Sequence, residues 1–65
     1  MKIDKQKILL LLAQRGLTKA ALAELAGIAR QNISAILERG TCNTVTAGKL
    51  AKGLGVPVAE IVKED

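Results

Sequence analysis

Apolar residues recur along this chain at intervals of three and four, the spacing that places them on one face of a helix. Four segments show this spacing: residues 4–15, 19–26, 30–39 and 45–54. A glycine follows each segment, as is common just past a helix end: Gly16, Gly27, Gly40 and Gly55. The residues expected to face inward are Ile8, Leu11, Leu12, Leu22, Leu25, Ala26, Ile33, Ile36, Leu37, Leu50, Ala51 and Leu54. The pattern predicts four helices joined by short connections.

The starts of these helices carry their own signals. Asp4, Thr18 and Thr44 precede helical stripes, and an oxygen on such a side chain accepts a hydrogen bond from a free N–H group of the first turn. Gly48 and Gly53 do not fit a helix end and are expected inside the fourth helix, at a cost of up to about 1 kcal/mol each.

A fifth, short helix is predicted over residues 57–62. Proline suits the first turn of a helix, where its missing N–H group is harmless. The stretch around Pro57 is also the only β-like one, and proline argues against a strand there. The predicted fold is therefore all-α, with Val58, Ile61 and Val62 buried by the last helix.

The apolar stripe of the first helix is wider than one core face needs. Leu9 and Leu10 lie beside the stripe rather than on it. They indicate either a contact surface for another subunit or a deeply buried helix, and deep burial is the preferred interpretation.

Length and composition restrict the class of protein. A chain of 65 residues forms a single small domain, residues 1–65, of marginal stability. One cysteine and no histidine make a disulfide or a metal an improbable support, which leaves close helix packing, a second subunit, or both. Hydrophobic residues make up 49% of the chain, which excludes intrinsic disorder. None of them is aromatic, so the chain lacks the stacking platforms of single-strand and RNA-binding modules.

Charge is unevenly distributed along the chain. Residues 1–55 hold nine Lys and Arg against three Asp and Glu, whereas residues 56–65 hold one against three. A basic body with an acidic tail favours a polyanionic partner, although solubility alone gives the same pattern. The apolar run of residues 8–13 is too short for a signal peptide or a membrane span, so a cytoplasmic protein with Cys42 as a reduced, inert thiol is predicted.

Residues 18–40 have the spacing of a helix-turn-helix. Ala23 lies four residues before Gly27, and a small residue there lets two steeply crossing helices approach closely. Ile28 follows the glycine and fills the space under the turn, while Ile33 and Ile36 fix the second helix to the core. The outer face of that second helix is left free, at a size that fits the major groove of DNA.

The stretch LTKAALAELAGIARQNISAILERG, residues 17–40, resembles the phage-repressor type of helix-turn-helix, the Cro/XRE-like family. The later stretch KLAKGLGVPVAEI, residues 49–61, is similar to the fourth and fifth helices of that family. The resemblance implies a compact five-helix, lambda-repressor-like domain that binds double-stranded DNA, is usually dimeric and usually regulates transcription.

Three positions depart from the family pattern. Lys19 stands where the family prefers Gln, and Ala29 stands where a capping Ser or Thr is common. Leu12 occupies the place of an Arg that often pairs with the acid at Glu38, so Glu38 is expected to meet water, Arg15 or Arg39.

Carried over by position, the resemblance implies two sets of DNA contacts. The predicted base contacts are Arg30, Gln31, Ser34 and Ala35, with Asn32 ranked lower. The predicted contacts with the DNA backbone are Thr18, Lys19, Arg39, Thr41 and Asn43. The alternative for each of these residues is an ordinary solvated surface side chain that contacts no DNA. Ser34 can instead form a hydrogen bond with the backbone of its own helix.

An enzyme is not expected. Without histidine and with Ser34 as the only serine, a Ser-His-Asp or Cys-His arrangement cannot form. No cluster of metal ligands and no phosphate-binding glycine motif occurs, so neither a cofactor nor a small-molecule substrate is predicted.

The predicted function is sequence-specific binding to an inverted-repeat operator by a homodimer, most simply as a repressor. Surplus apolar surface motivates the dimer, whose predicted interface residues are Val56, Val58, Ile61 and Val62. The alternative is a DNA-binding antitoxin or a protein-interaction adaptor of the same fold, with another protein as partner.

Overall fold

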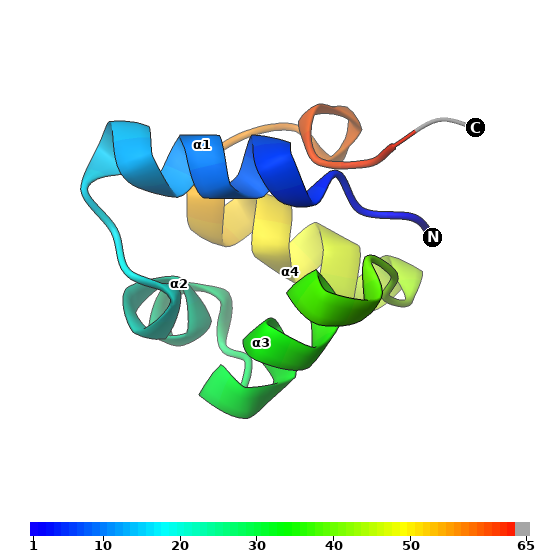
Figure 1. Cartoon of the computed structure of the whole chain (residues 1–65), viewed down its shortest axis with the longest axis horizontal. Helices are drawn as coiled ribbons and strands as arrows, with labels where there is room; N and C mark the ends of the chain where they lie inside the picture. Colours follow the sequence, from blue (N-terminus) through cyan, green and yellow to red (C-terminus); the bar gives the residue numbers. More distant parts are fainter. Residues whose placement is uncertain (64–65) are drawn as a thin grey trace.

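The computed structural model describes residues 1–63 and shows helices at all four predicted segments (Figure 1). The elements are α1 (Lys5–Arg15), α2 (Lys19–Ala26), α3 (Arg30–Arg39), α4 (Thr44–Leu54) and a one-turn 3-10 helix, η1 (Val58–Glu60). The all-α class is confirmed. Each α-helix ends in a glycine with a left-handed backbone, as the sequence predicted.

Side-chain caps begin three of the four α-helices. Asp4 accepts a hydrogen bond from the backbone N–H of Lys7 at 3.1 Å, and Thr18 accepts one from Ala21 at 3.0 Å. The third cap was predicted to be Thr44, but it is Asn43. Oδ1 of Asn43 accepts a hydrogen bond from the N–H of Thr46 at 2.7 Å. Asparagine is at least as good a cap as threonine, so α4 begins one residue earlier than the sequence suggested.

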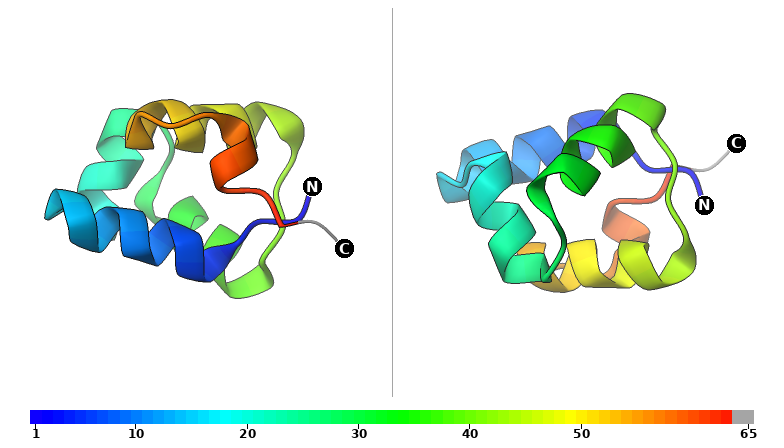
Figure 2. Two further views of the ribbon diagram at one scale, coloured as in Figure 1. Left: turned by 90° about the horizontal axis from the view of Figure 1, so that it is seen from above. Right: turned by 90° about the horizontal axis from the view of Figure 1, so that it is seen from below.

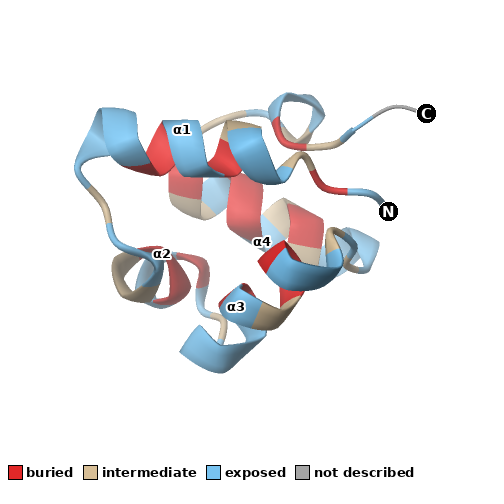
Figure 3. Ribbon diagram, viewed as in Figure 1, coloured by how far each residue is buried: buried red, intermediate tan, exposed pale blue. Residues whose placement is uncertain are grey.

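The core lies where α4 packs against α2 and η1, with α1 and α3 covering its other sides (Figures 1 and 3). Two expectations about it are wrong. Leu25 is 59% exposed, because α2 buries a face centred between Leu22, Ala23 and Ala26, and Leu25 lies about 100° away from that centre. α1 is not deeply buried either, since Leu9 and Leu10 are 38% and 54% exposed. Only one face of α1 meets the rest of the chain (Figure 3).

Helices α2 and α4 approach each other closely at Gly53. A Cβ atom placed on Gly53 would lie 3.1 Å from the backbone nitrogen of Ala26 and 3.2 Å from its Cβ. Gly48, in the same helix, has nothing within 4 Å of the corresponding position. Both glycines are inside α4, as predicted, but only Gly53 serves the packing of α2 on α4.

The chain after α4 does not form the predicted fifth helix. Pro57 is extended, with φ −64° and ψ 150°, and a single 3-10 turn follows it before Ile61 enters the core. The chain must then turn back to reach its own beginning, since the N–H of Asp4 donates to the carbonyl of Ile61 at 2.8 Å. That return ends the helical segment after one turn.

Residues 1–3, here called the arm, lie between two distant segments of the chain (Figure 2). Isolated antiparallel bridges join Lys2 to Thr41 and Ile3 to Val62. No strand was predicted here. The pairing is short, but it joins the start of the chain to the loop between α3 and α4 and to the segment after η1.

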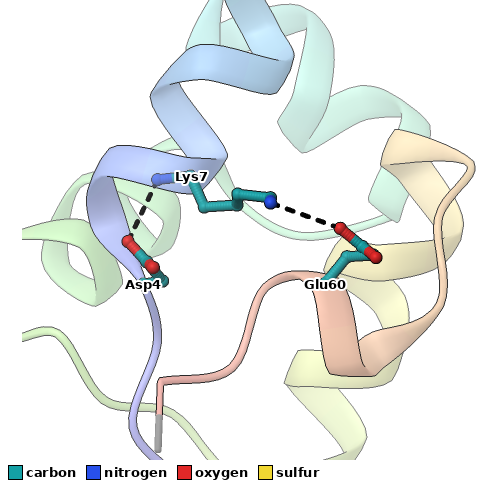
Figure 4. A network of polar contacts seen from close by, with 3 residues as sticks. All are labelled: Asp4, Lys7 and Glu60. Carbon is teal, nitrogen blue, oxygen red and sulfur yellow. Dashed lines mark hydrogen bonds and ion pairs between the residues drawn. The ribbon is translucent and has the colours of Figure 1, made fainter.

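One ion pair joins α1 to η1. Nζ of Lys7 lies 3.4 Å from a carboxylate oxygen of Glu60, next to the Asp4 cap (Figure 4). Both side chains are about half exposed, so the pair contributes at most about 1 kcal/mol. The tail acids Glu64 and Asp65 lie outside the described residues.

Candidate nucleic-acid interface

The turn between α2 and α3 has the construction predicted from the sequence. Gly27 is left-handed, with φ 69°, and the N–H of Ile28 donates back to the carbonyl of Ala23 at 2.9 Å. Ala23 is buried, and Ile28 packs against the core under the turn. These contacts lock α3 at a fixed position relative to α2, which is what a side chain reading a DNA groove requires.

The two faces of α3 differ sharply in burial (Figure 3). Its inner face, Ile33, Ile36 and Leu37, is buried in the core. Its outer face presents side chains that can donate and accept hydrogen bonds: Arg30, Gln31, Asn32 and Ser34 are exposed, and Ala35 is half-buried beside them. The four predicted base contacts therefore share the outer side of one helix, held from behind by three apolar anchors.

The N-terminus of α3 is open. Ala29 provides no side-chain cap, as predicted, and the first turn contains no acidic residue. The carbonyl of Ala29 accepts from the N–H groups of Asn32 and Ile33, whereas those of Arg30 and Gln31 have no partner within residues 1–63. The positive end of the helix dipole thus coincides with the side chains expected to enter the groove, which favours a polyanion.

The predicted DNA-backbone contacts come from the start of α2, the end of α3 and the loop after it. All of them are exposed: Thr18, Lys19, Arg39, Thr41 and Asn43. A depression of about 230 Å³ brings together Asn32, Arg39 and Asn43. Arg39 and Thr41 line a separate groove. Thr18 and Lys19 line neither, so the structure joins the loop residues to α3 and leaves the start of α2 as a separate predicted contact.

The helix caps determine what Thr18 and Asn43 can offer to a phosphate. Oγ1 of Thr18 accepts from the N–H of Ala21, which leaves its O–H free to donate. Oδ1 of Asn43 accepts from the N–H of Thr46, so the amide presents its two N–H donors. Both side chains are thus oriented as donors, which suits phosphate oxygen.

Sequence reasoning did not single out some residues that lie beside this surface. Thr46 lines the same depression as Asn43, and Lys2, Lys5 and Lys63 line the groove that contains Arg39 and Thr41. The three lysines are far from the motif in sequence. The arm brings them near it, because the arm pairs with the loop on one side and with Lys63 on the other and leads directly into Lys5. No local signal in the sequence indicates that pairing.

Cys42 lines the depression beside α3, and Glu38 lines the groove next to it. Burial raises the pKa of the Cys42 thiol above its ordinary value, against a smaller lowering by the nearby N-terminal ammonium. The thiol is therefore protonated at neutral pH. Glu38 is exposed and has no ion-pair partner within residues 1–63, so it is solvated, while Leu12 is buried in the core.

A short helix, a left-handed glycine turn and a second helix with a free polar outer face define a helix-turn-helix DNA-binding domain. A family model described as helix-turn-helix matches residues 8–61, which is most of the chain. The chain belongs to the Cro/XRE-like helix-turn-helix family, a family of DNA-binding domains of the transcription-regulator type. Comparison with curated proteins and with solved structures gave no match.

Residues 1–63 contain no group of three or more His, Cys, Asp and Glu placed to hold a metal ion. Among the helices of residues 1–63, none has the length and apolar character needed to cross a membrane.

Proposed function

We propose that this protein is a sequence-specific regulator of transcription that inserts α3 into the major groove of double-stranded DNA and acts as a repressor. The observation that carries the proposal is the outer face of α3. It exposes Arg30 and Gln31 at a helix start that has no side-chain cap and no acidic residue, and Ser34 one turn further on, while the inner face is fixed in the core.

The side chains on that face suit base recognition. The guanidinium of Arg30 can donate two parallel hydrogen bonds to O6 and N7 of guanine, and the amide of Gln31 can pair with N6 and N7 of adenine. The hydroxyl of Ser34 can serve either base, and the methyl group of Ala35 can contact the methyl group of thymine. Together they would specify a few adjacent base pairs.

The surrounding residues would hold the protein on the DNA backbone. Lys19 and Arg39 bring positive charge, and Thr18, Thr41 and Asn43 bring neutral donors. Such contacts fix register and orientation but carry no sequence information. Because Lys19 and Arg39 would neutralise DNA phosphates, the affinity for DNA should fall as the salt concentration rises.

A homodimer would place two α3 helices about 34 Å apart, on half-sites one helical turn apart. The predicted surface is formed by Val56, Val58 and Val62, which are half-buried in the monomer. The fourth predicted residue, Ile61, is fully enclosed by the core of the monomer, so it would support that surface from below.

The alternative is a DNA-binding antitoxin or adaptor whose second partner is another protein. The exposure of Leu9 and Leu10 on α1, and of Leu25 on α2, favours this candidate, because such side chains gain from being covered. A DNA-binding antitoxin would use α3 in the same way as the proposed regulator. An adaptor without DNA binding would not.

Selection of bound duplexes from a random DNA pool, at about 0.15 M salt, tests the proposal. The expected result is an enriched inverted repeat with half-sites roughly ten base pairs apart. A folded protein that enriches no sequence would refute the function and direct the search to a protein partner. Sedimentation of the purified protein with the selected duplex tests the dimer separately. A single protein chain per duplex would exclude it.

A further inference from the structure

The arm, residues 1–3, is the middle one of three extended segments that meet at one end of the molecule (Figures 1 and 2). On one side, the N–H of Ile3 donates to the carbonyl of Gly40 at 2.8 Å, and the N–H of Cys42 donates to the carbonyl of Met1 at 3.0 Å. On the other side, the N–H of Lys63 donates to the carbonyl of Lys2 at 3.0 Å. The arm is thus held from both sides by backbone hydrogen bonds.

Ile3 fixes the arm in place. Its side chain is only 3% exposed and belongs to the same apolar cluster as the buried faces of the helices. In extended chain, a shift of one residue turns every side chain to the opposite face. The arm therefore cannot slide past its neighbours without withdrawing Ile3 from the core.

The segment on which the arm acts is the loop between α3 and α4, residues 40–43. This loop carries Thr41 and Asn43, two of the proposed contacts with the DNA backbone, and it follows Arg39 directly. Bonds within the loop's own region tie its ends, since Gly40 donates to the carbonyl of Ile36 and Asn43 caps α4. The loop is also bonded to the arm. The carbonyl of Gly40 accepts from Ile3, and the N–H and carbonyl of Cys42 both bond to Met1.

We propose that the arm is a positioning element for this DNA-contacting loop, with Ile3 as its anchor. The inference rests on the proposed function and adds residues that do not touch DNA. By holding the loop against α3 before DNA arrives, the arm removes the entropy cost of ordering Thr41 and Asn43 at the moment of binding. The arm would thereby strengthen binding to every sequence equally.

The test compares two core substitutions of the same kind, Ile3→Ala and Ile8→Ala, because both side chains are buried but only Ile3 lies in the arm. Binding to the selected duplex and to duplexes with single base changes is measured well below both melting temperatures. Ile3→Ala should weaken binding about tenfold, by the same factor on each duplex, which corresponds to the cost of ordering one or two loop side chains on binding. Ile8→Ala should leave binding unchanged.

A double-mutant cycle separates positioning from simple loss of stability. If Ile3 acts through the loop, Ile3→Ala should weaken binding less in a Thr41→Ala background than in the unchanged protein. Additive losses, or equal losses from Ile3→Ala and Ile8→Ala, would overturn the proposal.

Hydrogen exchange gives a second readout that needs no DNA and tolerates milder variants. If Ile3→Ala does not fold, Ile3→Val and Ile8→Val replace the pair, each removing one methyl group. Ile3→Val should speed exchange of the Cys42 amide and leave that of Ile36 unchanged. No acceleration at Cys42, or the same acceleration in Ile8→Val, would contradict the arm's role. Failure of the unaltered protein to bind any duplex would refute the proposed function instead, while the exchange data alone still report whether the arm holds the loop.

Discussion

The contact between α2 and α4 gives a matched pair of substitutions with different expected effects on stability, Gly48→Ala and Gly53→Ala. Both glycines lie inside α4, and each costs up to about 1 kcal/mol relative to alanine through backbone entropy. They differ in what a new methyl group would meet. At Gly48 it finds nothing within 4 Å, whereas at Gly53 it lies 3.1 Å from the backbone nitrogen and 3.3 Å from the Cα of Ala26.

The nature of the contacted atoms determines the outcome at Gly53. A flexible side chain would move aside, but backbone atoms of α2 move only if the whole helix moves. Overpacking of this kind typically costs about 1–3 kcal/mol, which offsets or exceeds the gain of up to about 1 kcal/mol in helix propensity. Gly53→Ala should therefore range from neutral to destabilising by about 2 kcal/mol.

Gly48→Ala should show the propensity gain alone, about 0.8–1 kcal/mol of added stability. For a domain of this size, 1 kcal/mol corresponds to a shift in Tm of about 4–8 °C. Thermal and urea unfolding followed by circular dichroism measures both variants against the unaltered protein. The gain in helix propensity is nearly the same for the two variants. The difference between their unfolding free energies therefore measures the cost of crowding at the α2–α4 contact, about 1–3 kcal/mol. Equal stabilisation by the two substitutions would refute the close approach of α2 and α4.

Three further predictions concern the interface and its surroundings. Arg30→Ala should cost about 1–3 kcal/mol of binding and relax base preference at one operator position, and equal weakening on every duplex would exclude base reading. Lys19→Ala should weaken binding to all duplexes alike and reduce the slope of log affinity against log salt by about 1, and an unchanged slope would exclude a phosphate contact. Cys42 has a raised pKa in the folded protein, so its alkylation rate should rise with pH at higher pH than in the unfolded chain. Because its pKa is higher in the folded protein than in the unfolded chain, the thiol contributes fully to stability at pH values below its pKa in the unfolded chain. This contribution is lost as the pH rises through its pKa in the folded protein, and unfolding experiments at a series of alkaline pH values measure the loss. A thiol that titrates identically in folded and unfolded protein would contradict the burial.

Most helix boundaries were predictable because a chemical signal lies within a few residues of them, although the start of α3 at Ala29 has no side-chain cap. Asp4 and Thr18 have side-chain oxygens in the right place, and glycine supplies the left-handed residue at every helix end. The helix-turn-helix was predictable for the same reason, since its offsets from Gly27 all fall within one short stretch. Errors of one residue, such as Thr44 for Asn43, arise where two adjacent residues can both cap a helix.

The arm and the end of the chain were not predictable from local pattern. The backbone nitrogen of Met1 donates to the carbonyl of Cys42, 41 residues away, and nothing near either residue indicates that pairing. The exposure of Leu25 has a similar origin. Spacing within α2 allows more than one apolar face, and the position of α4 decides which of them is buried.

The absence of aromatic residues connects the packing of this chain to its function. Small side chains fill parts of the core: Ala23, Ala47 and Ala51. Without large side chains, a core of this size also needs helices that approach closely, and Gly53 allows α4 to approach α2 at Ala26. α2 is thereby held by backbone-to-backbone proximity, and α3 is tied to α2 through the Gly27 turn. Because three apolar anchors suffice to fix α3, its outer face is free to vary without affecting the core. We therefore expect exchanges at Arg30 and Gln31 to change which DNA is bound while leaving the unfolding free energy within about 0.5 kcal/mol.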